Sequence, residues 1–139
     1  MKILVIDGHT NFREPFCEFL HSCFPLISIK GSDEKSAMQT VRSFSPDMVI
    51  MDTGLEMVRD LRLNEPGLAI TLMVPYNMPE YVNAAYLSGA DHIFSKHSAA
   101  FPEINRLLGI IRAAAEGRGG RYAVEAVNKP GKAGASAEA

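Results

Sequence analysis

Short runs of consecutive apolar residues recur along the chain, and each run has the length of a β-strand. They span Lys2–Ile6, Leu26–Ile29, Met48–Met51 and Ala69–Val74, with a weaker run at His92–Phe94. Runs that are apolar at successive positions are typical of strands buried on both faces of a sheet. The pattern therefore predicts five strands in a sheet that is covered on both sides.

Between these runs, apolar residues recur at intervals of three and four, which is the helical period. The predicted helices span Phe12–Phe24, Asp33–Phe44, Leu55–Leu63, Pro79–Ser88 and Pro102 to about Glu116. Pro15 would fall in the opening turn of the first helix, where proline is tolerated. Ser32 or Asp33 would cap the second helix, and glycine would close the fourth and fifth.

Strands that alternate with helices favour a parallel sheet with helices on both faces. The predicted fold class is α/β, a flavodoxin-like doubly wound five-stranded parallel sheet of order 2-1-3-4-5 with five helices and a shortened third helix region. Residues 1–116 would form this domain. Residues 117–139 are mostly small or charged, apart from an apolar stretch at Tyr122–Val127, and are expected to form a flexible tail or a truncated linker.

Composition narrows the function classes. The chain has 139 residues, 47% of them hydrophobic and 22% charged, with a formal net charge of −2. No net positive field attracts nucleic acid or an anionic membrane, so direct nucleic-acid binding by this segment is not expected. No apolar run reaches the ~18 residues of a membrane span, and the N-terminus does not resemble a signal peptide. A cytoplasmic protein is the expectation.

Three charged residues fall at the ends of predicted strands. Asp7 follows the first strand, Asp52 follows the third and Lys96 follows the fifth. In a doubly wound sheet, ligands bind beyond the carboxyl ends of the strands, near the point where the strand order reverses. Two carboxylates and a lysine at one such edge suit Mg²⁺ together with a phosphate group.

The order of these residues resembles that of the bacterial response-regulator receiver domain, in the CheY-like superfamily. The stretches ILVIDGHTNFRE, PDMVIMD and GADHIFSKHS carry the resemblance, which spans about Met1 to Glu116 and is nearest to receivers of LuxR/NarL-type helix-turn-helix regulators. The resemblance implies that Asp52 is the residue that accepts a phosphoryl group from a histidine kinase. It also implies that Asp7 is the first acid of the Mg²⁺-binding pair, and that Lys96 pairs with the phosphate.

Four positions depart from the family pattern. The second acid of the pair is replaced by Gly8, which has no side-chain oxygen, and the switch hydroxyl is replaced by Val74, which cannot donate a hydrogen bond. The next residue normally donates a backbone N–H to the phosphate, but it is Pro75, which has none. The aromatic switch residue is replaced by Ile93.

The connection after Asp52 is a fifth departure. Related receivers carry a longer loop there, of which about six residues are absent, leaving a connection at the short end of the usual range. The metal ligands implied by the resemblance would be Asp7, Asp52 and the backbone carbonyl of Gly54. Because one carboxylate ligand is lost and the position of the carbonyl is altered, Mg²⁺ is expected to bind weakly or not at all.

These departures favour an atypical receiver, or pseudo-receiver. It would act through protein contacts in bacterial signal transduction or transcription regulation, and it would not be an enzyme beyond residual autophosphorylation. Two alternatives stay open. The chain is a two-component receiver that is phosphorylated on Asp52 by a histidine kinase, or it is a regulatory module that binds a small molecule in the altered pocket.

Other residues point to further contacts. His9, His92 and His97 fall near the same sheet edge, which makes a transition-metal site conceivable, although no ligand spacing supports it. The run Pro75–Tyr81 could contact a partner protein, either a histidine kinase or a regulator. Apolar residues at Leu107, Ile110 and Ala114 give the fifth helix a second apolar side, which is compatible with a homodimer.

Overall fold

The computed structural model describes residues 1–74, 78–95 and 101–116. Five strands form one parallel sheet of order β2-β1-β3-β4-β5, which confirms the predicted fold class. The strands are β1 (Lys2–Asp7), β2 (Ser28–Ser32), β3 (Met48–Asp52), β4 (Ala69–Val74) and β5 (His92–Ser95). The helices are α1 (Thr10–Cys23), α2 (Ala37–Phe44), α3 (Leu55–Asn64), α4 (Pro79–Ser88) and α5 (Phe101–Ala115).

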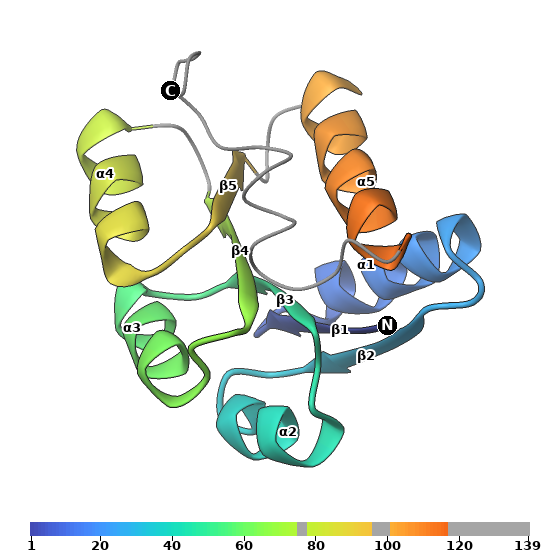
Figure 1. Cartoon of the computed structure of the whole chain (residues 1–139), viewed down its shortest axis with the longest axis horizontal. Coiled ribbons are helices and arrows are strands. Elements are labelled where there is room, and N and C mark those ends of the chain that lie inside the picture. The colour runs from blue at the N-terminus through green and yellow to red at the C-terminus, as the bar shows by residue number, and fades with distance from the viewer. Residues whose placement is uncertain (75–77, 96–100, 117–139) are drawn as a thin grey trace.

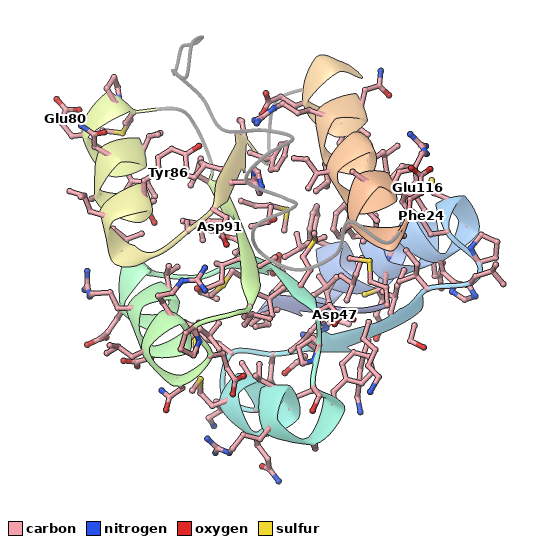
Figure 2. The ribbon with its side chains drawn as sticks, viewed as in Figure 1. Phe24, Asp47, Glu80, Tyr86, Asp91 and Glu116 are labelled. Carbon is pink, nitrogen blue, oxygen red and sulfur yellow. The ribbon has the colours of Figure 1, made fainter. Side chains whose placement is uncertain are left out.

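The helices lie in two layers, with α1 and α5 on one face of the sheet and α2, α3 and α4 on the other (Figure 1). Successive residues of the central strands point to opposite faces, so each strand contributes to two cores. Leu4, Ile6 and Met51 pack with α2, α3 and α4, whereas Val5 and Ile50 pack with α1 and α5. The side chains of both layers are drawn in Figure 2. This double burial explains the continuous apolar runs in the sequence.

The second strand was predicted too early in the chain. The structure places β2 at Ser28–Ser32, and Leu26, in the predicted strand, is 97% exposed. As an edge strand, β2 pairs with β1 alone and buries little, so it carries no apolar run. Leu26 and Ile27 lie in the turn that leads into β2, whereas Ser28 and Ile29 of the predicted strand belong to β2 itself.

Two helix starts also differ from the sequence prediction. The first helix begins at Thr10, so Pro15 lies inside the helix beyond its opening turn. The second helix begins at Ala37, and Asp33 instead accepts a hydrogen bond from the backbone N–H of Ser36 at 2.8 Å. Asp33 therefore stabilises the turn that leads into α2, and this hydrogen bond lowers the pKa of its carboxyl group.

The predicted outer face of the fifth helix is wrong. Leu107, Ile110 and Ala114 are 3%, 1% and 5% exposed, and they pack in the core between α5 and the sheet. The apolar arc of α5 is so wide that sequence alone left open which side faces the sheet. Homodimerisation stays a prediction, but these three residues no longer support it.

The connection from β3 to α3 is short, in line with the shortened third helix region. The strand ends at Asp52 and the helix begins at Leu55, so only Thr53 and Gly54 lie between them. Gly54 is the N-cap residue of α3, with extended backbone angles. This geometry brings the start of α3 next to the carboxyl end of β3.

None of the helices in the described part of the chain is long and apolar enough to cross a membrane.

Candidate functional site

The carboxyl ends of β1 and β3 place two aspartates side by side. Asp7 and Asp52 are register partners at the last position of the two strands. Adjacent strands lie ~4.8 Å apart, so both carboxylates lie close together at the carboxyl ends of the strands, a place that we call the acidic pocket. Asp7 is fully buried and Asp52 is partly exposed. The sequence prediction that these two acids meet therefore agrees with the strand register.

His9 joins this pair. Its backbone N–H donates a hydrogen bond to Oδ1 of Asp7 at 2.7 Å, and its ring Nδ1 lies 3.2 Å from the same oxygen. His9 is also the N-cap residue of α1, where its carbonyl accepts hydrogen bonds from the backbone N–H groups of Phe12 at 3.0 Å and Arg13 at 2.9 Å. The backbone of His9 is thus fixed between the acid at the end of β1 and the first turn of α1.

Arg13 anchors the same turn from the helix side. Its Nη1 donates to the backbone carbonyl of Asp7 at 2.6 Å, and its side chain covers Gly31 of the neighbouring strand β2. The Asp7 carboxylate itself lies close to His9 and Asp52. The pocket is therefore built by β1, β3 and the start of α1.

Among the described residues, Asp7, His9 and Asp52 form a group whose potential ligand atoms all lie within 4.8 Å of one another. Sequence reasoning grouped His9 with two other histidines instead. His92 opens β5, opposite Thr71, and is fully buried at the other end of the strand, so its predicted place at this edge is wrong. His97 lies outside the described residues. The sequence feature that could have placed His9 beside Asp7 is their close spacing, with only Gly8 between them.

The residues present do not fit Mg²⁺ well. This ion favours near-octahedral coordination by six oxygen atoms, and Gly8 offers no side-chain oxygen. The third expected ligand is the backbone carbonyl of Gly54, which is the N-cap residue of α3. The carbonyl of an N-cap residue accepts the first hydrogen bond of the helix, and this one also accepts a hydrogen bond from the hydroxyl of Thr53 at 3.2 Å. These hydrogen bonds compete with metal binding. Two carboxylates remain, beside an imidazole nitrogen that Mg²⁺ does not favour.

The predicted switch positions are apolar and buried. Val74 ends β4 and is 1% exposed, and Ile93 in β5 is 6% exposed; both belong to the core beneath α3 and α4. Neither side chain can bond a phosphoryl oxygen, because neither carries a polar atom. Pro75 and Lys96, the other two predicted site residues on this edge, lie outside the described residues.

The pKa of Tyr81 in α4 depends partly on the charge of Asp52. Its pKa is raised above the usual value for tyrosine, mainly by burial and further by the carboxylate of Asp52. Burial also raises the pKa of Tyr86, which lies further along α4, and Asp52 has no part in that shift. The hydroxyl group of Tyr81 is thus electrostatically coupled to the pocket, although sequence reasoning gave it only a role in partner binding.

A small apolar cavity lies between α1 and α5, next to the carboxyl ends of β4 and β5. It has a volume of about 100 Å³ and is lined by aromatic and aliphatic side chains that include Phe12, Phe16, Met73 and Phe94. Pockets that hold drug-sized ligands usually measure ~300–1,000 Å³. This cavity is therefore too small to hold a ligand of that size.

Comparison with known proteins agrees with this architecture. No protein-family model matches the chain. The transcriptional regulatory protein DegU of Brevibacillus brevis is 26% identical over 125 residues, which cover 84% of this chain and 51% of DegU. The chain thus spans about half the length of this relative.

Solved structures extend the comparison. The signal receiver domain of a DNA-binding response regulator from Colwellia psychrerythraea 34H superposes with a TM-score of 0.74 at 21% identity, covering 84% of this chain and 98% of that one. A LuxR-family two-component response regulator from Aurantimonas sp. SI85-9A1 superposes with a TM-score of 0.69 at 22% identity, covering 84% and 85% of the two chains. The chain has the fold of a response-regulator receiver domain, and the resemblance read from its sequence is confirmed.

Proposed function

We propose that the chain is an atypical receiver domain that acts in bacterial signal transduction through protein contacts, with Mg²⁺-dependent phosphorylation of Asp52 impaired or absent. The observation that carries this proposal is that the residues beside the carboxylate pair of Asp7 and Asp52 lack the polar groups that phosphorylation needs. Asp7 and Asp52 keep their places at the ends of β1 and β3, while Gly8 and Val74 supply no oxygen to the pocket.

The size of the expected defect follows from the missing groups. Each hydrogen bond to a charged partner contributes about 1.5–3 kcal/mol. The hydroxyl replaced by Val74 and the backbone N–H that proline lacks at position 75 would each have donated one such hydrogen bond. Together with the metal ligand lost at Gly8, their absence would lower the rate of phosphoryl transfer by several powers of ten, since each 1.4 kcal/mol is about a factor of ten. Residual autophosphorylation is the most that we expect, and the chain is not proposed to be an enzyme.

The α4 side of the molecule supports a role in protein contacts. Met78 caps the start of α4 and is 47% exposed, and Leu87 near its end is 89% exposed. On the neighbouring helix α3, Leu63 is 80% exposed. Exposed apolar side chains of this kind are available for contacts with a partner protein. A protein partner, either a histidine kinase or a regulator, would be recognised here, beside the part of the predicted patch at Pro75–Tyr81 that the structure describes.

A phosphorylation assay tests this proposal. The full chain is incubated with Mg²⁺ and acetyl phosphate and examined by intact-mass spectrometry, and amide resonances are recorded with beryllofluoride. We expect no mass gain and no shift around Asp52. A phosphorylatable receiver treated in parallel shows that the reagents are active. A mass gain that disappears in Asp52→Asn would overturn the proposal in favour of a phosphorylatable two-component receiver.

A further inference from the structure

We propose that Asp7, His9 and Asp52 form a binding site for a divalent transition-metal ion of the Zn²⁺ class, with His9 as the ligand that sets the preference over Mg²⁺. The inference rests on the proposed function in one respect, the poor fit of the pocket to Mg²⁺. It adds a ligand class and a way to regulate the pocket that does not depend on phosphate.

The distances already approach those of a coordination shell. Zinc binds imidazole nitrogen and carboxylate oxygen at ~2.0–2.1 Å, so two ligand atoms on one tetrahedral zinc lie ~3.3 Å apart. Nδ1 of His9 lies 3.2 Å from Oδ1 of Asp7. The ligand atoms of all three residues, Asp52 included, lie within 4.8 Å of one another. Binding would draw these ligand atoms from within 4.8 Å to the shorter spacing of a zinc shell.

The local backbone holds His9 in place for this role. Its N–H is bonded to Asp7 and its carbonyl to the first turn of α1, so the Cα atom cannot move far from the pocket. The imidazole makes no capping hydrogen bond to α1, and the side chain is 81% exposed, which leaves an approach for an ion from solvent. A ligand held in its bound position loses little conformational entropy on binding.

The chemistry of the donor set selects the ion. Imidazole suits Zn²⁺, Cu²⁺ and Ni²⁺, whereas Mg²⁺ prefers a shell of oxygen atoms. Gly8 offers no oxygen ligand, whereas His9, the next residue, is a potential ligand that lies close to both acids. A divalent ion would also offset the repulsion between the carboxylates of Asp7 and Asp52, which are register partners.

Binding would connect three elements that a phosphoryl group on Asp52 alone would not. The ion would join the end of β1 through Asp7, the end of β3 through Asp52 and the start of α1 through His9. Occupancy would therefore stabilise the carboxyl edge of the sheet in a metal-dependent way. It would also occupy the carboxylate oxygen that a phosphoryl donor must reach.

The test is a metal titration of the full chain after treatment with a chelator, without any phosphoryl donor. Zn²⁺ and Mg²⁺ are titrated separately by calorimetry, and Co²⁺ is added to record the absorption bands of the bound ion. We expect Zn²⁺ to bind at least about tenfold more tightly than Mg²⁺. His9→Gln and Asp52→Asn should each weaken Zn²⁺ binding by about tenfold or more, with loss of the Co²⁺ bands.

His21→Gln is the matched control, because His21 is an exposed histidine in the last turn of the same helix. It should bind Zn²⁺ as the unmodified chain does. Zn²⁺ binding that survives in His9→Gln, or equal affinity for Mg²⁺ and Zn²⁺, would overturn the inference. An Asp52-dependent mass gain with acetyl phosphate would instead overturn the proposed function and leave a His9-dependent Zn²⁺ site intact, so the two failures are distinguishable.

Discussion

Asp7 and Asp52 face each other as the last register pair of β1 and β3, and the residue that follows Asp7 is a glycine. Both carboxylates are present at the carboxyl ends of their strands, although the second acid expected from the family pattern is absent. A Cβ atom built on Gly8 meets no atom within 4 Å, and its φ is not positive. The missing acid can therefore be restored by substitution without strain.

Gly8→Asp should strengthen Mg²⁺ binding by about tenfold or more, since it returns a carboxylate ligand to the pocket. Without metal, the variant should be less stable by about 1 kcal/mol, which is the Coulomb energy of two like charges 4 Å apart in water. Thermal denaturation with and without Mg²⁺ measures both effects. Gly8→Asn, which has the same shape without the charge, is the control, and an equal response of the two variants would contradict the prediction.

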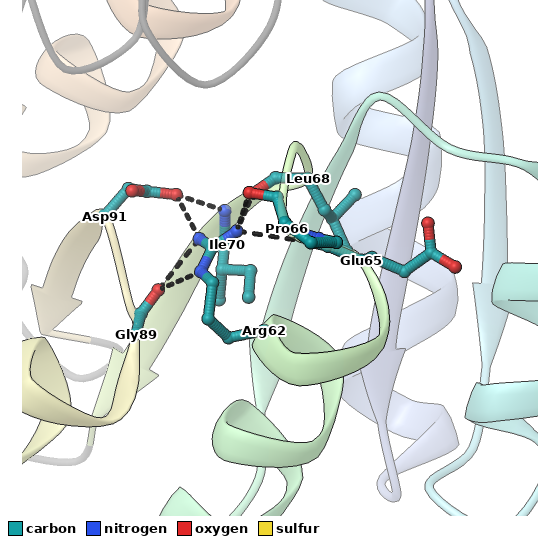
Figure 3. A network of polar contacts seen from close by, with 7 residues as sticks. All are labelled: Arg62, Glu65, Pro66, Leu68, Ile70, Gly89 and Asp91. Carbon is teal, nitrogen blue, oxygen red and sulfur yellow. Dashed lines mark hydrogen bonds and ion pairs between the residues drawn. The ribbon is translucent and has the colours of Figure 1, made fainter.

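A second prediction concerns a hydrogen-bond network that joins the loops before β4 and β5, at the amino ends of these strands (Figure 3). Arg62 of α3 donates to the carboxylate of Asp91 at 2.8 Å and to the carbonyl of Gly89 at 2.8 and 3.1 Å. It also donates to the carbonyl groups of the loop before β4, those of Glu65, Pro66 and Leu68. The same Asp91 oxygen accepts the backbone N–H of Ile70.

Arg62→Ala should lower the free energy of unfolding by about 3 kcal/mol, because it removes the positive charge that pairs with the buried carboxylate of Asp91 and a donor shared by several carbonyl groups. Arg59→Ala is the matched control, since Arg59 also reaches from α3 to the end of α4, through one hydrogen bond to Ser88, but is exposed. Its effect should stay within about 0.5 kcal/mol. Urea unfolding measures both, and equal midpoints for the two variants would disprove the role given to Arg62.

Gly89 shows how this network constrains the sequence. The residue has φ of 121°, and an added Cβ atom would lie 2.8 Å from Cβ and Cγ of Arg62. Sequence reasoning identified this glycine as the end of the fourth helix, which is correct. The packing of Arg62 against it depends on two segments that are distant in sequence, so no local pattern could reveal it.

The same contrast between local sequence patterns and long-range packing separates the elements that the sequence predicted correctly from those that it did not. The central strands were predictable because they are buried on both faces, and their apolar runs report that directly. The edge strand β2 was misplaced, since pairing on one side only leaves its residues polar and half exposed. The buried face of α5 was also misread, because a helix with a wide apolar arc does not reveal which part of the arc meets the sheet.

The candidate site was predictable to the extent that it depends on strand ends. Asp7 and Asp52 could be paired from the strand order alone. The contact between His9 and Asp7 depends on the turn between β1 and α1, in which the backbone of His9 bonds to both neighbours. That turn geometry is not encoded in any periodicity, so the histidine could be located near the edge of the sheet but not assigned to the acids.

The last prediction uses Tyr81 as a reporter of the charge on Asp52. Burial is the main cause of the raised pKa of Tyr81, and the Asp52 carboxylate adds to it. Asp52→Asn removes the negative charge, so the pKa of Tyr81 should fall toward the usual value but remain above it, because burial is unchanged. NMR titration of tyrosine ring resonances in the labelled chain measures this shift.

Tyr86 provides the control within the same helix. Burial raises its pKa, with smaller influences from Arg106, Glu103 and Asp91. Because Asp52 is not among these influences, Asp52→Asn should leave the pKa of Tyr86 unchanged. A shift confined to Tyr81 would mean that α4 senses the charge at the end of β3 through its first turn. Equal shifts at both tyrosines would mean that the substitution had altered the packing of the whole helix, and the proposed electrostatic coupling would then be wrong.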